Sequence, residues 1–390
     1  MARLLTSPEH ARTRSLITAI SSAPVAGAGF GLLMPLVSLN LEAMTGSGTV
    51  VGLNATAAAI STLVMTPLLP AILAWIAPRK AMIFCTLFTA IGVAVFPFVP
   101  DVYAWWVLRF VTGCAVTLVF VGSETWINQL ARPETRATLL AVYATALSGG
   151  FGSGALLLTA LGSQGFVPWL AGSMIFLLGA VPLALLRGPE ITPPDRSDAG
   201  PASLWSKARL APAAMTAGLV FGAMETSVFS LLPVYVRRLG FEDQLVGIVI
   251  GAAALGGLAL QIPIGRLADR IGRRLVLRLV ALGAAALPPV VIFAGSNLTA
   301  LLPLVFVMSG LSSAFYTLGL ALVGERVDLK SLAAANAAFI FAYGLGSLVG
   351  PPMMGAAMDA LNPYGLMITF TLLSLVYLSV TALEKRTDKD

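Results

Sequence analysis

GRLADRIGRR, residues Gly265 to Arg274, lies between two apolar segments, Leu245–Ile264 and Leu275–Phe293, that are each long enough to cross a membrane. The run carries four arginines and one aspartate, and Arg278 adds a fifth positive charge nearby. Short cytoplasmic loops of membrane proteins are enriched in positive charge. The stretch therefore predicts two membrane-spanning helices joined by a tight turn on the cytoplasmic side.

The composition of the whole chain agrees with a membrane protein. Of its 390 residues 57% are hydrophobic and 11% are charged, and the mean hydropathy is +0.90, well outside the range of soluble globular proteins. One crossing needs about 20 apolar residues. On that length we predict an all-α membrane protein with twelve transmembrane helices, at Leu16–Leu41, Val50–Ala71, Ala81–Val99, Ala104–Gly122, Ala137–Leu161, Phe166–Leu186, Ala211–Val236, Leu245–Ile264, Leu275–Phe293, Leu298–Val323, Leu332–Met354 and Tyr364–Leu383.

The basic residues predict the orientation. We place 21 of the 24 Lys and Arg residues in the two termini and in the even-numbered connections between spans, so both termini are expected to be cytoplasmic. Arg237 and Arg238 are exceptions, because they fall on the opposite side. Trp105 and Trp106 lie where an outer aromatic belt is expected. The isoelectric point of about 9.6 thus follows from topology, and nucleic-acid binding is not predicted.

The longest polar interval divides the chain into two similar halves. It is rich in proline and charge and falls between the sixth and seventh predicted spans. SGGFGSG (148–154) in the first half matches YGLGSLVG (343–350) in the second. Two parallel six-helix repeats are typical of transporters whose halves rock around a site near the bilayer midplane. The predicted parts are a first half at residues 1–186, a cytoplasmic linker at 187–210 and a second half at 211–390.

These features together resemble the major facilitator superfamily. Its loop signature, Gly-x-Leu-x-Asp-Arg-x-Gly-Arg-Arg/Lys, occurs between spans two and three and is often repeated between spans eight and nine. Here the second copy is complete, whereas the first is reduced to PAILAWIAPRK, Pro70–Lys80, with Ala74 at the position of the acid. The resemblance implies an inner gate that depends on the second copy, docked against the start of span five: Gly265, Asp269, Arg270, Gly272, Arg273 and Arg274, with Arg136 opposite and Glu124 nearby.

Further motifs narrow the resemblance. RFVTG, Arg109–Gly113, is like the superfamily's Arg-x-x-x-Gly element in span four. SETWIN (Ser123–Asn128) and VGERVDLKSLAAANAAF (Val323–Phe339) are similar to the YcaD-like bacterial branch, which implies a multi-pass protein of the bacterial inner membrane. Drug/proton antiporters of the superfamily carry a Gly-Pro element in span five, but here that pair occurs in span eleven, at Gly350-Pro351. This departure weakens the likeness to those antiporters.

Three ionisable residues fall within the predicted spans, where a charge costs about 2.5 to 3.5 kcal/mol at the centre of a helix. Glu225, near mid-depth of span seven, is either a proton acceptor or cation-binding carboxylate, or a neutral hydrogen-bonded acid that holds helices together. Arg109 in span four is either a partner for an anion or a structural residue. Glu124, near the inner end of span four, is either an inner-gate or helix-end partner for Arg132 or Arg136, or a coupling site.

The residues expected in the central cavity are mostly apolar. The resemblance implies that spans one, four, seven and ten line it, and at four-residue spacing Phe221, Glu225 and Phe229 share one helical face. Few polar groups are available, so the composition suits a lipophilic or amphipathic solute better than a sugar. The predicted cavity residues are Phe30, Met34, Arg109, Phe221, Glu225, Phe229, Ser313 and Tyr316. The glycine runs in spans five and eleven are expected to let helices pack closely.

Three functions remain open from the sequence. The first is proton-coupled efflux of a small amphipathic solute by alternating access. The second is uptake symport or facilitative exchange of a small metabolite by the same fold, and the third is a non-transporting sensor or membrane enzyme. An enzyme is not expected, because no convergent cluster of His, Cys and acidic residues is evident, and neither a cofactor nor a metal site is predicted. The expected partners are the solute, protons and the lipid bilayer, with the protein acting as a monomer.

Overall fold

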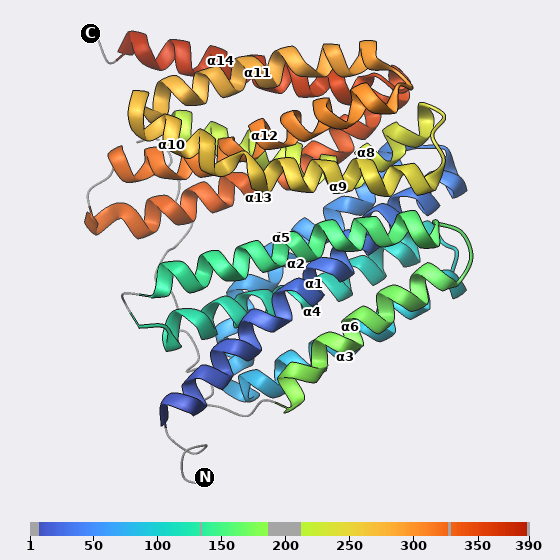
Figure 1. Cartoon of the computed structure of the whole chain (residues 1–390), viewed down its shortest axis with the longest axis vertical. Helices are drawn as coiled ribbons and strands as arrows, with labels where there is room; N and C mark the ends of the chain where they lie inside the picture. Colours follow the sequence, from blue (N-terminus) through green and yellow to red (C-terminus); the bar gives the residue numbers. More distant parts are fainter. Residues whose placement is uncertain (1–7, 133–134, 186–211, 327–328, 388–390) are drawn as a thin grey trace. The chain divides into compact units, whose positions relative to one another are not determined.

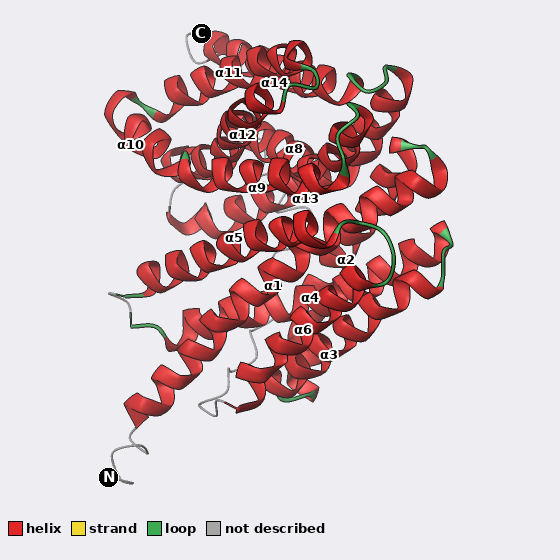
Figure 2. Ribbon diagram, turned by 45° about the vertical axis from the view of Figure 1, so that its right-hand side comes forward, coloured by secondary structure: helices red, strands yellow, loops and turns green. Residues whose placement is uncertain are grey.

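The computed structural model describes residues 8–132, 135–185, 212–326 and 329–387, and the predicted linker at 187–210 lies outside these ranges. All regular structure in the described ranges is helical (Figure 1, Figure 2). In a bilayer this is expected, because a helix satisfies its backbone hydrogen bonds internally. The elements are α1 (Pro8–Thr45), α2 (Gly48–Trp75), α3 (Pro78–Val95), η2 (Phe96–Phe98), α4 (Val102–Leu130), α5 (Arg136–Leu161), α6 (Val167–Leu185), α8 (Pro212–Arg238), α9 (Asp243–Ala259), α10 (Gln261–Ile271), α11 (Arg273–Ala294), α12 (Leu298–Arg326), α13 (Leu329–Ala360) and α14 (Gly365–Thr387).

Twelve segments of the described chain are long and apolar enough to cross a membrane, which confirms the predicted number. Helices α9 and α10 together supply one of them, Asp243–Ile271. Several helices run past the apolar segments on which the prediction rested. Helix α1, for example, begins at Pro8 and ends at Thr45, because an established helix adds further polar residues at little cost.

Local signals determine several helix ends. The Asp101 carboxylate accepts a hydrogen bond from the backbone N–H of Ala104 at 2.8 Å and so caps the start of α4. Helix α3 begins with Pro78, whose missing N–H is not needed at that position. Helix α5 ends at Leu161 and is followed by Gly162, which has a φ of +69°.

The turn predicted over GRLADRIGRR is much shorter in the structure. Residues 265–271 are helical within α10, and α11 begins at Arg273. Gly272 alone makes the turn, with a φ of +96° that favours glycine. Arginine, leucine and alanine are strong helix formers. Asp269 in α10 lies 3.7 Å from Arg273 at the start of α11, so this ion pair spans the turn at Gly272. Gly265, the first residue of the predicted turn, lies inside α10.

The chain forms two compact units. Unit 1 lies within Met1–Val37 and Ala57–Arg196, and unit 2 lies within Ser38–Thr56 and Ser197–Asp390. Residues 38–56, the end of α1 and the start of α2, therefore belong to unit 2, and we call this segment the hairpin. Helix α1 contains Pro35, just before the boundary at Val37.

Glycines bring neighbouring helices into backbone contact in both units. In unit 1, a Cβ at Gly150 on α5 would collide with the carbonyl of Pro24 on α1. In unit 2, a Cβ at Gly346 on α13 would collide with the carbonyl of Leu219 on α8. The prediction that the two glycine runs serve close packing is confirmed at these positions.

The prediction that Trp105 belongs to an outer aromatic belt is wrong. Its side chain is 3% exposed and packs inside unit 1, with ring centroids 5.2 Å from Phe96 and 5.3 Å from Trp169. Its indole N–H donates to the carbonyl of Val99 at 2.7 Å. Tyr103, two residues earlier, is the exposed aromatic residue at this helix start, at 83%. The prediction used depth along the chain, but the face of the helix decides which ring meets lipid.

We expect Gly150→Val to lower the thermal stability of the purified protein, because overpacking against a carbonyl commonly costs about 1–3 kcal/mol. Gly149→Val is the matched control, since no atom lies within 4 Å of a Cβ at that position. The two variants make the same change in helix propensity at neighbouring positions. Thermal unfolding in detergent compares them, and equal midpoints would contradict the packing interpretation.

Candidate functional site

Glu225 lies on α8, a helix of unit 2 whose residues are mostly buried and apolar. The hydroxyl of Tyr343, on α13, donates a hydrogen bond to Oε2 of Glu225 at 2.8 Å. The two residues are 118 positions apart in the sequence. The acid predicted from its depth in span seven therefore has a specific partner on a neighbouring helix, which the sequence interpretation did not identify.

Aromatic rings surround this pair. Phe221, one turn before Glu225 on α8, lies 5.2 Å from Tyr316 on α12 and 5.6 Å from Tyr343, measured between ring centroids. Tyr316 also lies 5.3 Å from Phe339. Rings at these separations attract one another and exclude water. Of the predicted cavity residues, the structure brings Glu225, Phe221 and Tyr316 together, whereas Phe229 lies one turn farther along α8.

The hydroxyl groups of α12 face in different directions. Ser312 faces α8, because its Oγ lies 3.8 Å from the sulfur of Met224. Ser313 lies against α9, where a Cβ at Gly257 would be 2.9 Å from its Oγ. Thr317 donates to Gln261 at 3.4 Å. The predicted cavity residues Ser313 and Tyr316 therefore lie against different neighbours.

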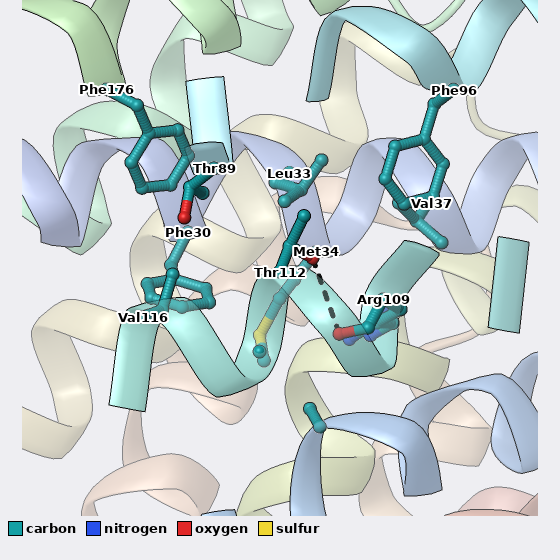
Figure 3. Close-up of a pocket in the computed structure, with 12 residues that line it drawn as sticks. Phe30, Leu33, Met34, Val37, Thr89, Phe96, Arg109, Thr112, Val116 and Phe176 are labelled. Carbon is teal, nitrogen blue, oxygen red and sulfur yellow. Dashed lines mark hydrogen bonds between the residues drawn. The ribbon is translucent and has the colours of Figure 1, made fainter. Parts of the chain in front are cut away.

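Unit 1 contains an internal pocket that joins three predicted residues, Phe30, Met34 and Arg109 (Figure 3). Arg109 is 8% exposed, so its guanidinium lies inside the unit and away from lipid. The free volume is about 30 Å³, room for about two water molecules. The lining residues are Phe30, Leu33, Met34, Val37, Ala58, Thr89, Phe96, Arg109, Thr112, Gly113, Val116 and Phe176.

The hydroxyls of this pocket are already engaged with their own helices. Thr89 donates to the carbonyl of Cys85 at 2.8 Å, and Thr112 donates to that of Leu108 at 2.7 Å. Figure 3 shows the rings of Phe30 and Phe176 on one side of the pocket, and the ring of Phe96 on the same side as Arg109. The pocket thus combines aromatic rings with one cationic group.

Arg237 and Arg238, the two exceptions to the charge pattern, are neutralised within unit 2. Arg237 binds Asp243 through two hydrogen bonds of 2.8 and 2.6 Å. Arg238 lies 2.7 Å from Glu42 and 2.8 Å from Asp359. We call Glu42, Arg238, Asp359 and residues 47–49 the hairpin network. Sequence reasoning did not identify it.

The predicted inner-gate residues have local partners in unit 2. Arg273 contacts Asp269 on α10 and donates to Glu325 on α12 at 2.9 Å. Arg270 lies on α10 and Arg274 at the start of α11. In unit 1, Arg136 is the first residue of α5 and Glu124 lies in the C-terminal part of α4. Docking of Asp269 against the start of α5 stays a prediction.

Comparisons with known proteins match nearly the whole chain. A model of the Major Facilitator Superfamily matches residues 20–257 and 242–389. The Bacillus subtilis (strain 168) protein described as the uncharacterized MFS-type transporter YfkF is 24% identical over 368 residues, covering 91% of this chain and 92% of YfkF. The uncharacterized MFS-type transporter YcaD of Escherichia coli O7:K1 (strain IAI39 / ExPEC) is 28% identical over 282 residues, 71% of each chain. The crystal structure of nucleoside transporter NupG matches with a TM-score of 0.79 at 15% identity, over 96% of this chain and 98% of NupG, and this likeness shows the fold alone.

We expect Tyr343→Phe to lower the free energy of unfolding by about 0.6–2 kcal/mol, the range for hydrogen bonds between membrane helices. The substitution keeps the ring against Phe221 and removes the hydroxyl that Glu225 accepts. A double-mutant cycle with Glu225→Ala, measured by denaturant unfolding in detergent, isolates the pair. An additive result would show that the hydrogen bond contributes nothing to stability.

Proposed function

Because the chain belongs to the major facilitator superfamily, and is a multi-pass transporter rather than an enzyme, we propose that it exports a small amphipathic solute in exchange for protons. Glu225 accepts and releases the proton, and the two halves alternate access to the solute. The observation that carries the proposal is the Glu225–Tyr343 hydrogen bond, which places an ionisable group inside a membrane span with one specific donor.

The surroundings of Glu225 can accommodate both of its protonation states. When the carboxylate is ionised, the Tyr343 hydroxyl donates to it at 2.8 Å and compensates part of the lost hydration. When the carboxyl is protonated, it loses the charge that the apolar span opposes. A group with two accessible states inside a span is the requirement for moving protons across it.

The pocket of unit 1 supports an amphipathic solute. Its rings and the thioether of Met34 suit an apolar body, and Arg109 suits a polar or anionic end. A free volume of about 30 Å³ is smaller than a solute, so binding requires side chains such as Met34 to move. The aromatic cluster of unit 2 offers a second apolar surface, next to Glu225.

The proposed setting is the bacterial inner membrane, with both termini cytoplasmic and the chain acting as a monomer. The likeness to YcaD and YfkF supports a bacterial membrane transporter. Proteoliposomes loaded with a pH-sensitive dye test the function directly. Tetraphenylphosphonium, octanoate and uridine are suitable probes, because they represent a lipophilic cation, an amphipathic anion and a nucleoside, the last chosen from the NupG likeness. Proton entry coupled to solute exit supports efflux, co-movement supports uptake symport, and solute exchange without proton flux supports a facilitative exchanger.

We expect Glu225→Gln to abolish proton flux stimulated by a transported probe, because the amide keeps the shape of the side chain but does not titrate. Exchange of solute without a pH gradient is expected to survive. Glu242→Gln is the matched control, since Glu242 is exposed at the start of α9. Accumulation against a gradient at the parent rate in the Glu225→Gln protein would overturn the coupling role.

We expect Arg109→Lys to slow transport about tenfold, because lysine keeps the charge but loses the planar fork that binds two acceptors. Arg79→Lys is the control within unit 1, where the guanidinium donates to the carbonyls of Leu183 and Ala184. Transport rates are measured in the same proteoliposomes at equal protein content. Parent rates in both Arg109→Lys and Arg109→Ala would show that Arg109 has no part in transport.

A further inference from the structure

The internal pocket of unit 1 has an excess of one positive charge in its wall. Among the described residues that line it, Arg109 alone is charged, and Thr89 and Thr112 are the polar residues beside it. The guanidinium lies inside the unit, because Arg109 is 8% exposed. A positive charge in apolar surroundings is costly unless a negative charge lies close to it. The wall of the pocket therefore favours a negatively charged ligand.

The acidic residues of α4 lie too far along the helix to supply that negative charge. At a rise of 1.5 Å per residue, Glu124 lies about 22 Å after Arg109 and Asp101 about 12 Å before it. The Asp101 carboxylate also accepts a hydrogen bond from the N–H of Ala104. Arg109 has another interaction within the described chain, but a guanidinium carries five N–H donors and can keep one contact while it binds a ligand.

The free volume limits the ligand to a few atoms. It is about 30 Å³, room for about two water molecules. A chloride ion is little larger than a water molecule and fits this space without displacement of a side chain. A divalent anion would leave one negative charge uncompensated beside the rings of Phe30 and Phe176. Size and charge together favour one small monovalent anion.

Two hydroxyl groups are available to complete the coordination of such an ion. Thr112 follows Arg109 by one turn of α4, and Thr89 lies on α3. Each hydroxyl donates to the carbonyl four residues earlier in its own helix, at 2.7 Å for Thr112 and 2.8 Å for Thr89. A hydroxyl hydrogen rotates about its C–O bond. Either group can therefore redirect its hydrogen from a neutral carbonyl to an anion, which is the stronger acceptor.

The pocket lies close to one end of the helices that form it. Phe96 belongs to η2, in the connection between α3 and α4, and it lies on the same side of the pocket as Arg109 (Figure 3). Arg109 itself lies about 10 Å along α4 from its first residue, Val102. Met34 is unbranched and flexible, so it can move aside as an ion enters.

We propose that this pocket is an internal binding site for one small monovalent anion, such as chloride, held by Arg109 and the hydroxyls of Thr89 and Thr112. The ion neutralises the guanidinium and stabilises unit 1. The site goes beyond the proposed export, because the ion binds without a solute and without a pH gradient. A solute with an anionic end would occupy the same place, so the ion is bound while the solute is absent.

Thermal unfolding of the purified protein in detergent tests the site. Sodium chloride is titrated against sodium gluconate at equal ionic strength, because gluconate is too large for the pocket. A ligand that binds the folded state alone raises the unfolding midpoint. We expect a saturable rise of several degrees with chloride, bromide or nitrate relative to gluconate, and none with sulfate. Equal midpoints in chloride and gluconate at every concentration would overturn the site.

Arg109→Gln removes the positive charge and is expected to abolish the difference between the two salts. Arg109→Lys keeps the charge, so it is expected to retain the rise at a higher chloride concentration. Arg79→Gln is the matched control within unit 1, because Arg79 binds the carbonyls of Leu183 and Ala184 away from the pocket, and it is expected to respond as the parent does. The same chloride response in the parent and in Arg109→Gln would show an adventitious ion only.

If Arg109→Gln does not fold, Thr112→Val is measured instead, since it keeps the shape of the side chain and removes one donor. We expect it to raise the chloride concentration at half-saturation about tenfold, and an unchanged concentration would exclude Thr112 from the site. Failure of this proposal is distinguishable from failure of proton coupling. Glu225→Gln that retains coupled transport refutes the coupling role alone, whereas loss of the chloride effect in the parent protein refutes the anion site alone.

Discussion

Inside a bilayer no water is available to a polar group, so each one depends on a partner within the chain. The backbone meets this requirement by being helical through the described spans. Single side chains meet it through individual hydrogen bonds. The Thr112 hydroxyl donates to a carbonyl of its own helix, and Glu225 accepts a hydrogen bond from Tyr343. At the end of α8 the same requirement gathers several charges, because Arg238 lies against both Glu42 and Asp359. The positions of possible function are therefore the positions where a polar group is retained in spite of its cost.

The sequence predicted the number of spans and the two glycine contacts, because apolar length and residue size are local properties. The sequence predictions were wrong where one local pattern is compatible with two structures. The charges of GRLADRIGRR indicate a side of the membrane, but their residues are good helix formers, and only Gly272 leaves the helix. Trp105 has the depth of a belt residue but lies on the buried face of α4.

The candidate site was predicted in part. Depth and helical spacing identified Glu225, Phe221 and Tyr316. Phe30 and Met34 were predicted because they lie in a span expected to line the cavity, and Arg109 because it is ionisable within a span. Tyr343 and Asp359 were missed, because their partners lie 118 and 121 or more positions away, and one sequence does not show which helices touch. A signal was nevertheless present. Arg237 and Arg238 departed from the predicted charge pattern, and an arginine that becomes buried needs an acidic partner.

Pro35 gives α1 a mechanical property. Proline has no N–H, so the carbonyl of Gly31 cannot accept the backbone hydrogen bond that residue 35 would otherwise donate. The missing hydrogen bond lies just before Val37, where α1 leaves unit 1 and enters unit 2. A helix bends most easily where a backbone hydrogen bond is absent. A displacement of the hairpin would consequently be absorbed by bending of α1 between Gly31 and Val37, beyond its close contacts with α5 at Pro24, Gly27 and Gly31.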